Sequence, residues 1–161
     1  AYEIYQCDWS SDVCSSDLEA RRQQQHLAKA IEMFEEIQSQ FSLLKAEMQI
    51  DQEAAVCAAI DFGEIGLKVL GDPNVRLEFD IEGLVVIRCS RLENYTKTLR
   101  EVLSSKSSFL ILSSSLANKF GIEGRFKSFS TVQNPVKDFA AESLVYYREY
   151  PQIRIFKRDI A

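Results

Sequence analysis

Histidine is almost missing from this chain, since His26 is its single example among 161 residues. One histidine without partners builds neither a Ser-His-Asp triad nor a zinc site, so histidine-based catalysis is not expected. Walker loops and GxGxxG motifs are also missing, which removes two common phosphate-binding loops. The apolar runs 84–87 and 109–112 are far too short to cross a bilayer, so we expect no membrane span.

The N-terminal residues 1–18 resemble a translated sequencing-library adapter. Back-translation of Ser10–Leu18 as AGT TCA GAC GTG TGC TCT TCC GAT CT gives the end of a common indexed adapter, and Tyr2–Ile4 fit its upstream part. Segments of this origin are set aside before the fold is considered. We therefore expect residues 1–18 to be non-native and disordered, and the chain to be a fragment of a larger protein whose true N-terminus is missing.

Without that segment the chain is close to neutral. Residues 1–18 hold four of the 24 acidic residues and none of the 19 basic ones, so their removal changes the formal charge from −5 to about −1. Two of the four cysteines, Cys7 and Cys14, also belong to residues 1–18. The others, Cys57 and Cys89, lie in apolar runs without CxxC spacing, which indicates buried thiols and favours a reducing, cytoplasmic compartment. We expect no metal and no cofactor.

Residues 19–50 carry the strongest helical pattern. Apolar residues recur every three or four positions and form one seam: Leu27, Ala30, Phe34, Ile37, Phe41, Leu44 and Met48. So long a helix is stable in water only when its apolar side is buried, against either another chain or another helix of this chain. The seam therefore predicts a contact with another protein, or with a second copy, through residues 27–48.

The remaining residues, 51–161, predict a mixed domain of the α/β or α+β class. Its first part is expected to contain a helix, a hairpin and a second helix, in this order: helix 51–70, strand 75–82, strand 84–89 and a helix opened by a Ser90–Glu93 capping box. The strand 75–82 alternates apolar and charged residues, which is typical of a half-buried strand.

The second part continues the alternation with five expected elements: strand 109–112, helix 116–120, strand 125–132, a helix from Asn134-Pro135 and strand 153–160. The core side chains of the helix from Asn134 are expected to be Phe139, Leu144, Val145 and Tyr147. From residue 84 the order is β-α-β-α-β-α-β, which predicts a mixed sheet with strands 84–89 and 109–112 parallel through a right-handed crossover. A truncated C-terminus stays open.

Three serines, Ser113, Ser114 and Ser115, follow a buried strand and precede a short helix. In an open α/β sheet this is where ligands bind and where helix amides hold anions. The serines are therefore candidates for an anion site of a nucleotide-binding or enzyme domain. Helix capping explains the same residues without any ligand, and we favour it because serine is common at helix caps.

The acidic side chains of Glu78, Asp80 and Glu82 share one face of a strand. Such a set can hold a divalent cation, but the wet face of an antiparallel strand produces the same pattern, and we favour that interpretation.

The C-terminal third is basic and rich in aromatic residues. Arg154, Lys157 and Arg158 are candidates for nucleic-acid or polyanion binding by charge and stacking. The local charge excess is modest, so we favour a structural role for most of these side chains.

The sequence thus predicts a non-enzymatic interaction or scaffolding module, with no catalytic residue assigned. Nucleic-acid binding and an α/β enzyme or nucleotide-binding domain stay as alternatives.

Overall fold

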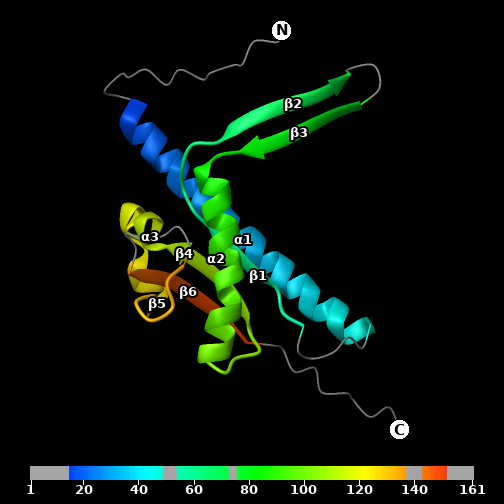
Figure 1. Ribbon diagram of the computed structural model, residues 1–161, viewed down its shortest axis with the longest axis vertical. Helices are drawn as coiled ribbons and strands as arrows, with labels where there is room; N and C mark the ends of the chain where they lie inside the picture. The colour runs from blue at the N-terminus through cyan, green and yellow to red at the C-terminus, as the bar shows by residue number, and fades with distance from the viewer. Residues whose placement is uncertain (1–14, 49–53, 73–75, 137–142, 152–161) are drawn as a thin grey trace. The chain divides into compact units, whose positions relative to one another are not determined.

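The computed structural model describes four ranges of the chain, residues 15–48, 54–72, 76–136 and 143–151. The chain divides into two units, Ala1–Met33 and Phe34–Ala161. Within the described ranges the fold is mixed α/β, with three α-helices, a four-stranded mixed sheet and a separate two-stranded antiparallel sheet (Figure 1).

A long helix, α1 (Ser15–Met48), is the first element of the structure. The helix expected within 19–50 is confirmed over 19–48, and residues 49–50 lie outside the described ranges. The helix begins four residues earlier than expected, so residues 15–18 of the adapter-like segment are helical. Residues 1–14 lie outside the described ranges. None of the helices in the described part of the chain is long and apolar enough to cross a membrane.

The four-stranded sheet has the order β1-β4-β6-β5. Its strands are β1 (Cys57–Ile60), β4 (Ser108–Ser113), β5 (Lys127–Ser130) and β6 (Leu144–Tyr150). β1 and β4 are parallel, whereas β6 is antiparallel to both β4 and β5. Every residue of β4 is buried, so this central strand carries the core of the sheet, and the strand expected at 109–112 is confirmed.

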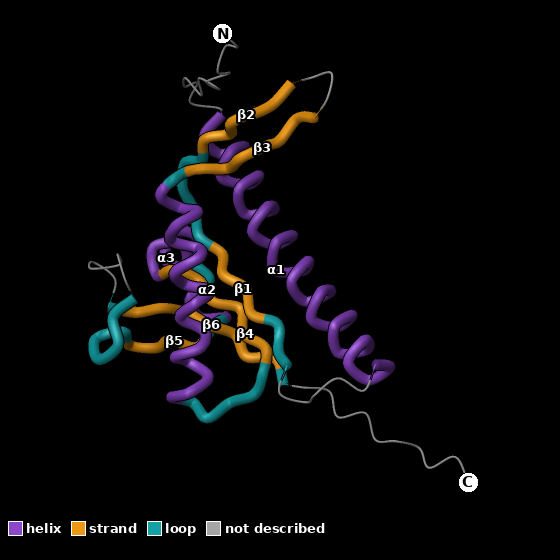
Figure 2. Tube along the Cα trace, turned by 45° about the vertical axis from the view of Figure 1, so that its right-hand side comes forward, coloured by secondary structure: helices purple, strands orange, loops and turns teal. Residues whose placement is uncertain are grey.

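Helix α2 (Leu84–Val102) covers one face of the sheet (Figures 1 and 2). The core between them contains buried side chains of α2, β4 and β6: Leu92, Tyr95, Leu99, Phe109, Ile111, Val145 and Tyr147. The spacing of seven and fourteen residues between Val85, Leu92 and Leu99 places all three on one side of the helix. That side is the buried one, which is what holds α2 on the sheet.

Helix α1 contacts the opposite face of the sheet through Phe34 and Glu35. The ring of Phe34 packs edge-on against Tyr150 of β6 with the centroids 5.3 Å apart. Glu35 Oε1 lies 2.8 Å from Nη1 of Arg148 and accepts a hydrogen bond from the Tyr150 hydroxyl at 3.0 Å. Side chains alternate along a strand, so Arg148 and Tyr150 lie on the face that Val145 and Tyr147 do not use.

A two-stranded ribbon, β2 (Gly66–Asp72) and β3 (Arg76–Glu82), stands apart from the sheet (Figure 2). Its register pairs Leu67 with Ile81. Strand 75–82 is thus confirmed, but it pairs with β2 and not with the expected strand 84–89. Gly83 links β3 to α2 with φ of 146°, a conformation that residues with a Cβ rarely adopt.

Helix α3 (Ser114–Phe120) and the 3₁₀ turn η1 (Glu123–Arg125) connect β4 to β5. Gly121 ends α3 in the left-handed conformation, with φ of 61°, as expected of a glycine after a short helix. The expected helix 116–120 and the expected strand at 125–132 are therefore confirmed, with shifted ends.

The expected helix over 51–70 is wrong. Residues 57–60 form the strand β1, which pairs in parallel with Phe109–Leu112, and residues 66–72 form β2. Sheet pairing therefore overrides the helix propensity of an alanine-rich stretch. Gly63 and Gly66, which weaken a helix, lie between the two strands and at the start of the second.

The expected buried strand over 84–89 is also wrong, because these residues are the first turns of α2. The parallel pairing expected between strands 84–89 and 109–112 is therefore wrong, and so is the expected β-α-β-α-β-α-β order from residue 84. The helix expected from Ser90 is the later part of α2, but Ser90 and Glu93 lie within this helix and do not begin it. Val85 lies on the buried side of α2, whereas Leu84 and Ile87 are 67% and 50% exposed.

The helix expected from Asn134-Pro135 is absent from the described residues, since 131–136 are irregular and 144–150 are β6. Leu144, Val145 and Tyr147 follow a period of two: the first is exposed and the others are buried. Phe139 and the expected strand 153–160 lie outside the described ranges.

Candidate functional site

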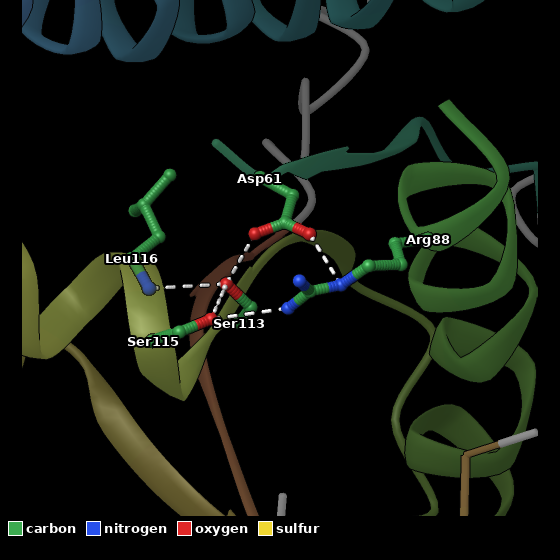
Figure 3. Close-up of polar contacts among 5 residues, drawn as sticks. All are labelled: Asp61, Arg88, Ser113, Ser115 and Leu116. Atoms are coloured by element: carbon green, nitrogen blue, oxygen red, sulfur yellow. Dashed lines mark hydrogen bonds and ion pairs between the residues drawn. The ribbon is translucent and has the colours of Figure 1, made fainter. Parts of the chain in front are cut away.

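A cluster of polar side chains lies where β1 and β4 end at the same edge of the sheet (Figure 3). Asp61 directly follows β1, Ser113 is the last residue of β4, Arg88 comes from α2 and Ser115 from α3. Parallel strands end together, and so two residues 52 positions apart in the sequence become neighbours.

The contacts of this cluster are short and mutual. Ser113 Oγ donates to Asp61 Oδ1 at 2.5 Å and accepts from the backbone amide of Leu116 at 3.1 Å. The other carboxylate oxygen, Oδ2, lies 2.9 Å from Nε of Arg88. Arg88 Nη2 donates to Ser115 Oγ at 3.0 Å, and the two serine oxygens are 3.2 Å apart. The carboxylate of Asp61 thus links the end of β4 and the N-terminus of α3, through Ser113, to helix α2, through Arg88.

Burial decides what this cluster can do. The Asp61 side chain is 1% exposed and Ser113 is completely buried, so neither can meet a molecule in solution without a rearrangement. The Ser113 hydroxyl is occupied by the amide that it caps and by a carboxylate of the protein itself. The negative charge beside Ser113, where the sequence made a bound anion a candidate, is therefore the carboxylate of Asp61. Ser114 is half-buried and Ser115 is exposed at the rim.

Cys89 lies beside the same cluster in α2. Burial raises the pKa of its thiol, and the negative charge of Asp61 raises it further. A thiol that stays protonated is a poor nucleophile. Cys89 and Cys57 are both half-buried, and so neither is the fully buried thiol that the sequence predicts.

The acidic strand candidates all belong to β3. Asp80 and Glu82 are exposed, and Glu82 Oε2 lies 2.5 Å from Nζ of Lys68 on the neighbouring strand. Glu78 is in β3, but its side chain is not described. Within the described ranges, no group of three or more histidine, cysteine, aspartate or glutamate side chains is placed to hold a metal ion.

The basic C-terminal candidates Arg154, Lys157 and Arg158 lie outside the described ranges. Two bases that precede them, Lys127 and Arg148, form ion pairs within the protein. Lys127 Nζ lies 3.6 Å from Glu149, and Arg148 is paired with Glu35 and stacks over Phe126 at 4.7 Å.

The seam of α1 divides into a buried and an exposed part. Leu27 and Phe34 are buried, and Ala30 and Phe41 are half-buried. Ile37, Leu44 and Met48 are 48%, 45% and 63% exposed. Phe34 packs against β6 of the same chain. The seam predicts a different partner there, either another helix or another chain.

Sequence reasoning missed Asp61 and Arg88. The available signal was an acid that directly follows an apolar strand, as Ser113 follows another, but it depends on recognising β1. Comparison of the chain with protein-family models, with curated proteins and with solved structures gives no match.

Proposed function

We propose that this chain is a protein-interaction module that self-associates through α1. The contact surface, called here the α1 stripe, consists of Ile37, Phe41, Leu44 and Met48. The observation that carries the proposal is the exposure of Ile37, Leu44 and Met48, each between 45% and 63%, on one side of a helix. Contiguous exposed apolar side chains on a soluble protein are typical of an interaction site.

The fold itself does not require this exposure. The adjacent side of the same helix is already held, because Phe34 and Gln38 are 4% and 9% exposed and Glu35 is paired with Arg148. Near the C-terminal end, Lys45 Nζ donates to the carbonyl of Ala54 at 2.6 Å. The helix is thus attached along one side and presents the α1 stripe beside it.

The spacing of the α1 stripe fits a second copy of the chain. Its steps of four, three and four residues are the same in both directions along the helix. A two-fold axis between Ser42 and Leu43 therefore places Ile37 opposite Met48 of the partner copy, and Phe41 opposite Leu44. In such a two-fold contact both copies use the same surface, and most homodimers associate in this way. The pairing is antiparallel.

Sedimentation equilibrium over a range of concentrations tests this proposal with a matched pair of substitutions. Leu44→Glu places a charge in the α1 stripe and is expected to weaken self-association at least about tenfold, since burying a leucine contributes roughly 1.5–3 kcal/mol. Leu43→Glu is the control. Leu43 is 49% exposed, like Leu44 at 45%, but lies about 100° further round the helix.

A wild-type chain that stays monomeric at every concentration would overturn the proposal. An equal effect of Leu43→Glu and Leu44→Glu would do the same, because the contact would then not involve the α1 stripe.

A further inference from the structure

A small pocket lies between α2 and the irregular segment that follows β5. Four residues of α2 and two of that segment line it: Arg91, Asn94, Tyr95, Thr98, Pro135 and Val136. From Arg91, the other α2 residues are three, four and seven positions further on, which places all four on one side of the helix. The pocket has a volume of about 280 Å³, close to that of about nine water molecules. This volume is just below the range of pockets for drug-sized ligands, so the pocket suits a small molecule.

The hydroxyl of Tyr95 is a buried donor without a partner. Tyr95 is 6% exposed, and its oxygen makes no hydrogen bond within the described part of the chain. The ring is held by core packing, edge-on against Phe129 with the centroids 6.4 Å apart. A buried hydroxyl without a partner destabilises a fold, whereas phenylalanine would keep the same ring contacts without that cost. The fold alone therefore gives no reason for a tyrosine at this position.

The lining of the pocket favours an anion. Among the described residues that line it, Arg91 is the one that carries a charge, and it is half-buried. Thr98 and Tyr95 add two hydroxyl groups from the same side of α2. Burial raises the pKa of Tyr95, so its hydroxyl keeps its proton at neutral pH and can donate a hydrogen bond. The pocket thus combines a positive charge with hydroxyl donors.

We propose that this pocket binds a small organic carboxylate. A carboxylate presents two acceptor oxygens, and an arginine guanidinium binds both through parallel hydrogen bonds. The Tyr95 hydroxyl donates to the same group and gains the partner that it lacks in the free chain. Pro135 and Val136 contact the hydrocarbon part of the ligand.

Access to the Tyr95 hydroxyl depends on Val136. The oxygen itself is covered, and Val136, which is 5% exposed, packs in the same core cluster as Tyr95. Val136 belongs to the irregular segment 131–136, so it can shift without breaking the pairing of the sheet. Binding therefore includes a small movement of this segment. The pocket shares no residue with the α1 stripe, and so either proposal can fail without the other.

Nuclear magnetic resonance of the full-length chain tests the site, with benzoate as the probe because it is a carboxylate of suitable size. Benzoate is expected to shift the backbone amides around residues 91–98 and 135–136 in a saturable manner. Arg91→Gln should weaken binding about tenfold and Tyr95→Phe about fivefold. Arg125→Gln and Tyr146→Phe are the matched controls, since neither residue lines the pocket, and both should bind as the wild type does.

Urea denaturation of the free chain separates a ligand-binding role of Tyr95 from a structural one. Tyr95→Phe should leave the midpoint unchanged or raise it, because no hydrogen bond within the chain is lost. Benzoate should raise the midpoint of the wild type more than that of Tyr95→Phe. Should Arg91→Gln not fold, Arg91→Lys replaces it, since lysine keeps the charge and loses the two parallel bonds.

Four results would overturn the proposal. Benzoate shifts none of these amides, the variants at Arg91 and Tyr95 bind it as tightly as their controls do, Tyr95→Phe lowers the urea midpoint of the free chain, or inorganic phosphate binds as tightly as benzoate. The last result would show a general attraction of anions to Arg91 and not a carboxylate site.

Discussion

Asp61 and Ser113 show how single side chains link the elements of this fold. A buried carboxylate is costly unless it is paired, and here one oxygen accepts a hydrogen bond from Ser113 while the other forms an ion pair with Arg88, without a hydrogen bond among the described residues. The same serine caps α3. Removal of the carboxylate would leave a hydroxyl and a guanidinium of the cluster without their partner.

Asp61→Ala is therefore expected to lower the free energy of unfolding by about 3 kcal/mol, since it breaks a buried ion pair from one side. Urea denaturation measures the change. Asp80→Ala is the control, because Asp80 is exposed and its loss should change stability by less than about 0.5 kcal/mol. Equal effects of the two substitutions would show that the Asp61 contacts do not stabilise the fold.

Glu149 gives the protein a defined dependence on pH. The hydrogen bond from Ser105, at 2.6 Å, is the main cause that holds the pKa of this carboxyl below its ordinary value of 4.5, and Ser107 and Lys127 add to it. A depressed pKa in the folded state means that the stabilisation is present above pH 4.5 and disappears as the pH falls through the folded value.

Ser105→Ala should therefore lower the melting temperature at about pH 7, and the difference from wild type should shrink as the pH falls below 4.5. Thermal melts at several pH values measure it. Ser128→Ala, at an exposed position of β5, should give a difference that does not change with pH. A Ser105→Ala difference that is constant down to about pH 2 would contradict this account.

At the scale of elements, the sequence predicts those whose signals are local. α1 has an unbroken helical period, β3 alternates strictly, and α3 lies between a serine cap and Gly121. β1 could not be predicted, because this short segment with two alanines becomes a strand only through pairing with β4, which lies about fifty residues away in the sequence.

The start of α2 was predictable in principle. The β-branched run at 85–87 favours a strand, but the spacing of Val85, Leu92 and Leu99 already carries the helical period. The polar cluster was missed for the same reason as β1, since Asp61 is placed at the sheet edge only by that strand. Of its members, only the two serines follow an element with a clear local signal.

The turn into α2 depends on Gly83. Its φ of 146° favours glycine, and a Cβ at this position would lie 2.7 Å from the carbonyl oxygen of Glu64. Gly83→Ala is expected to destabilise the fold by about 2–3 kcal/mol in chemical denaturation. Gly124→Ala is the control, because nothing lies within 4 Å of a Cβ there, and it should change stability by less than about 0.5 kcal/mol. Similar losses for both would show that the turn tolerates a side chain.

At the scale of the whole molecule, the α1 stripe is the surface on which the proposed function depends. The α1 stripe exposes apolar side chains on a helix whose adjacent side is held by Phe34, Gln38 and the Glu35–Arg148 ion pair. We propose a second copy as its occupant, by antiparallel helix pairing.

Cysteine cross-linking tests the central claim, self-association through the α1 stripe, most directly. Chains with Ile37→Cys and chains with Met48→Cys are mixed and oxidised, with the wild type as the background for its own cysteines. Antiparallel pairing predicts a covalent dimer that contains one chain of each kind. Ile37→Cys alone should give little, since its two copies lie about 16 Å apart along the helices, well beyond disulfide reach. A mixture that gives no covalent dimer above the wild-type background would contradict the account.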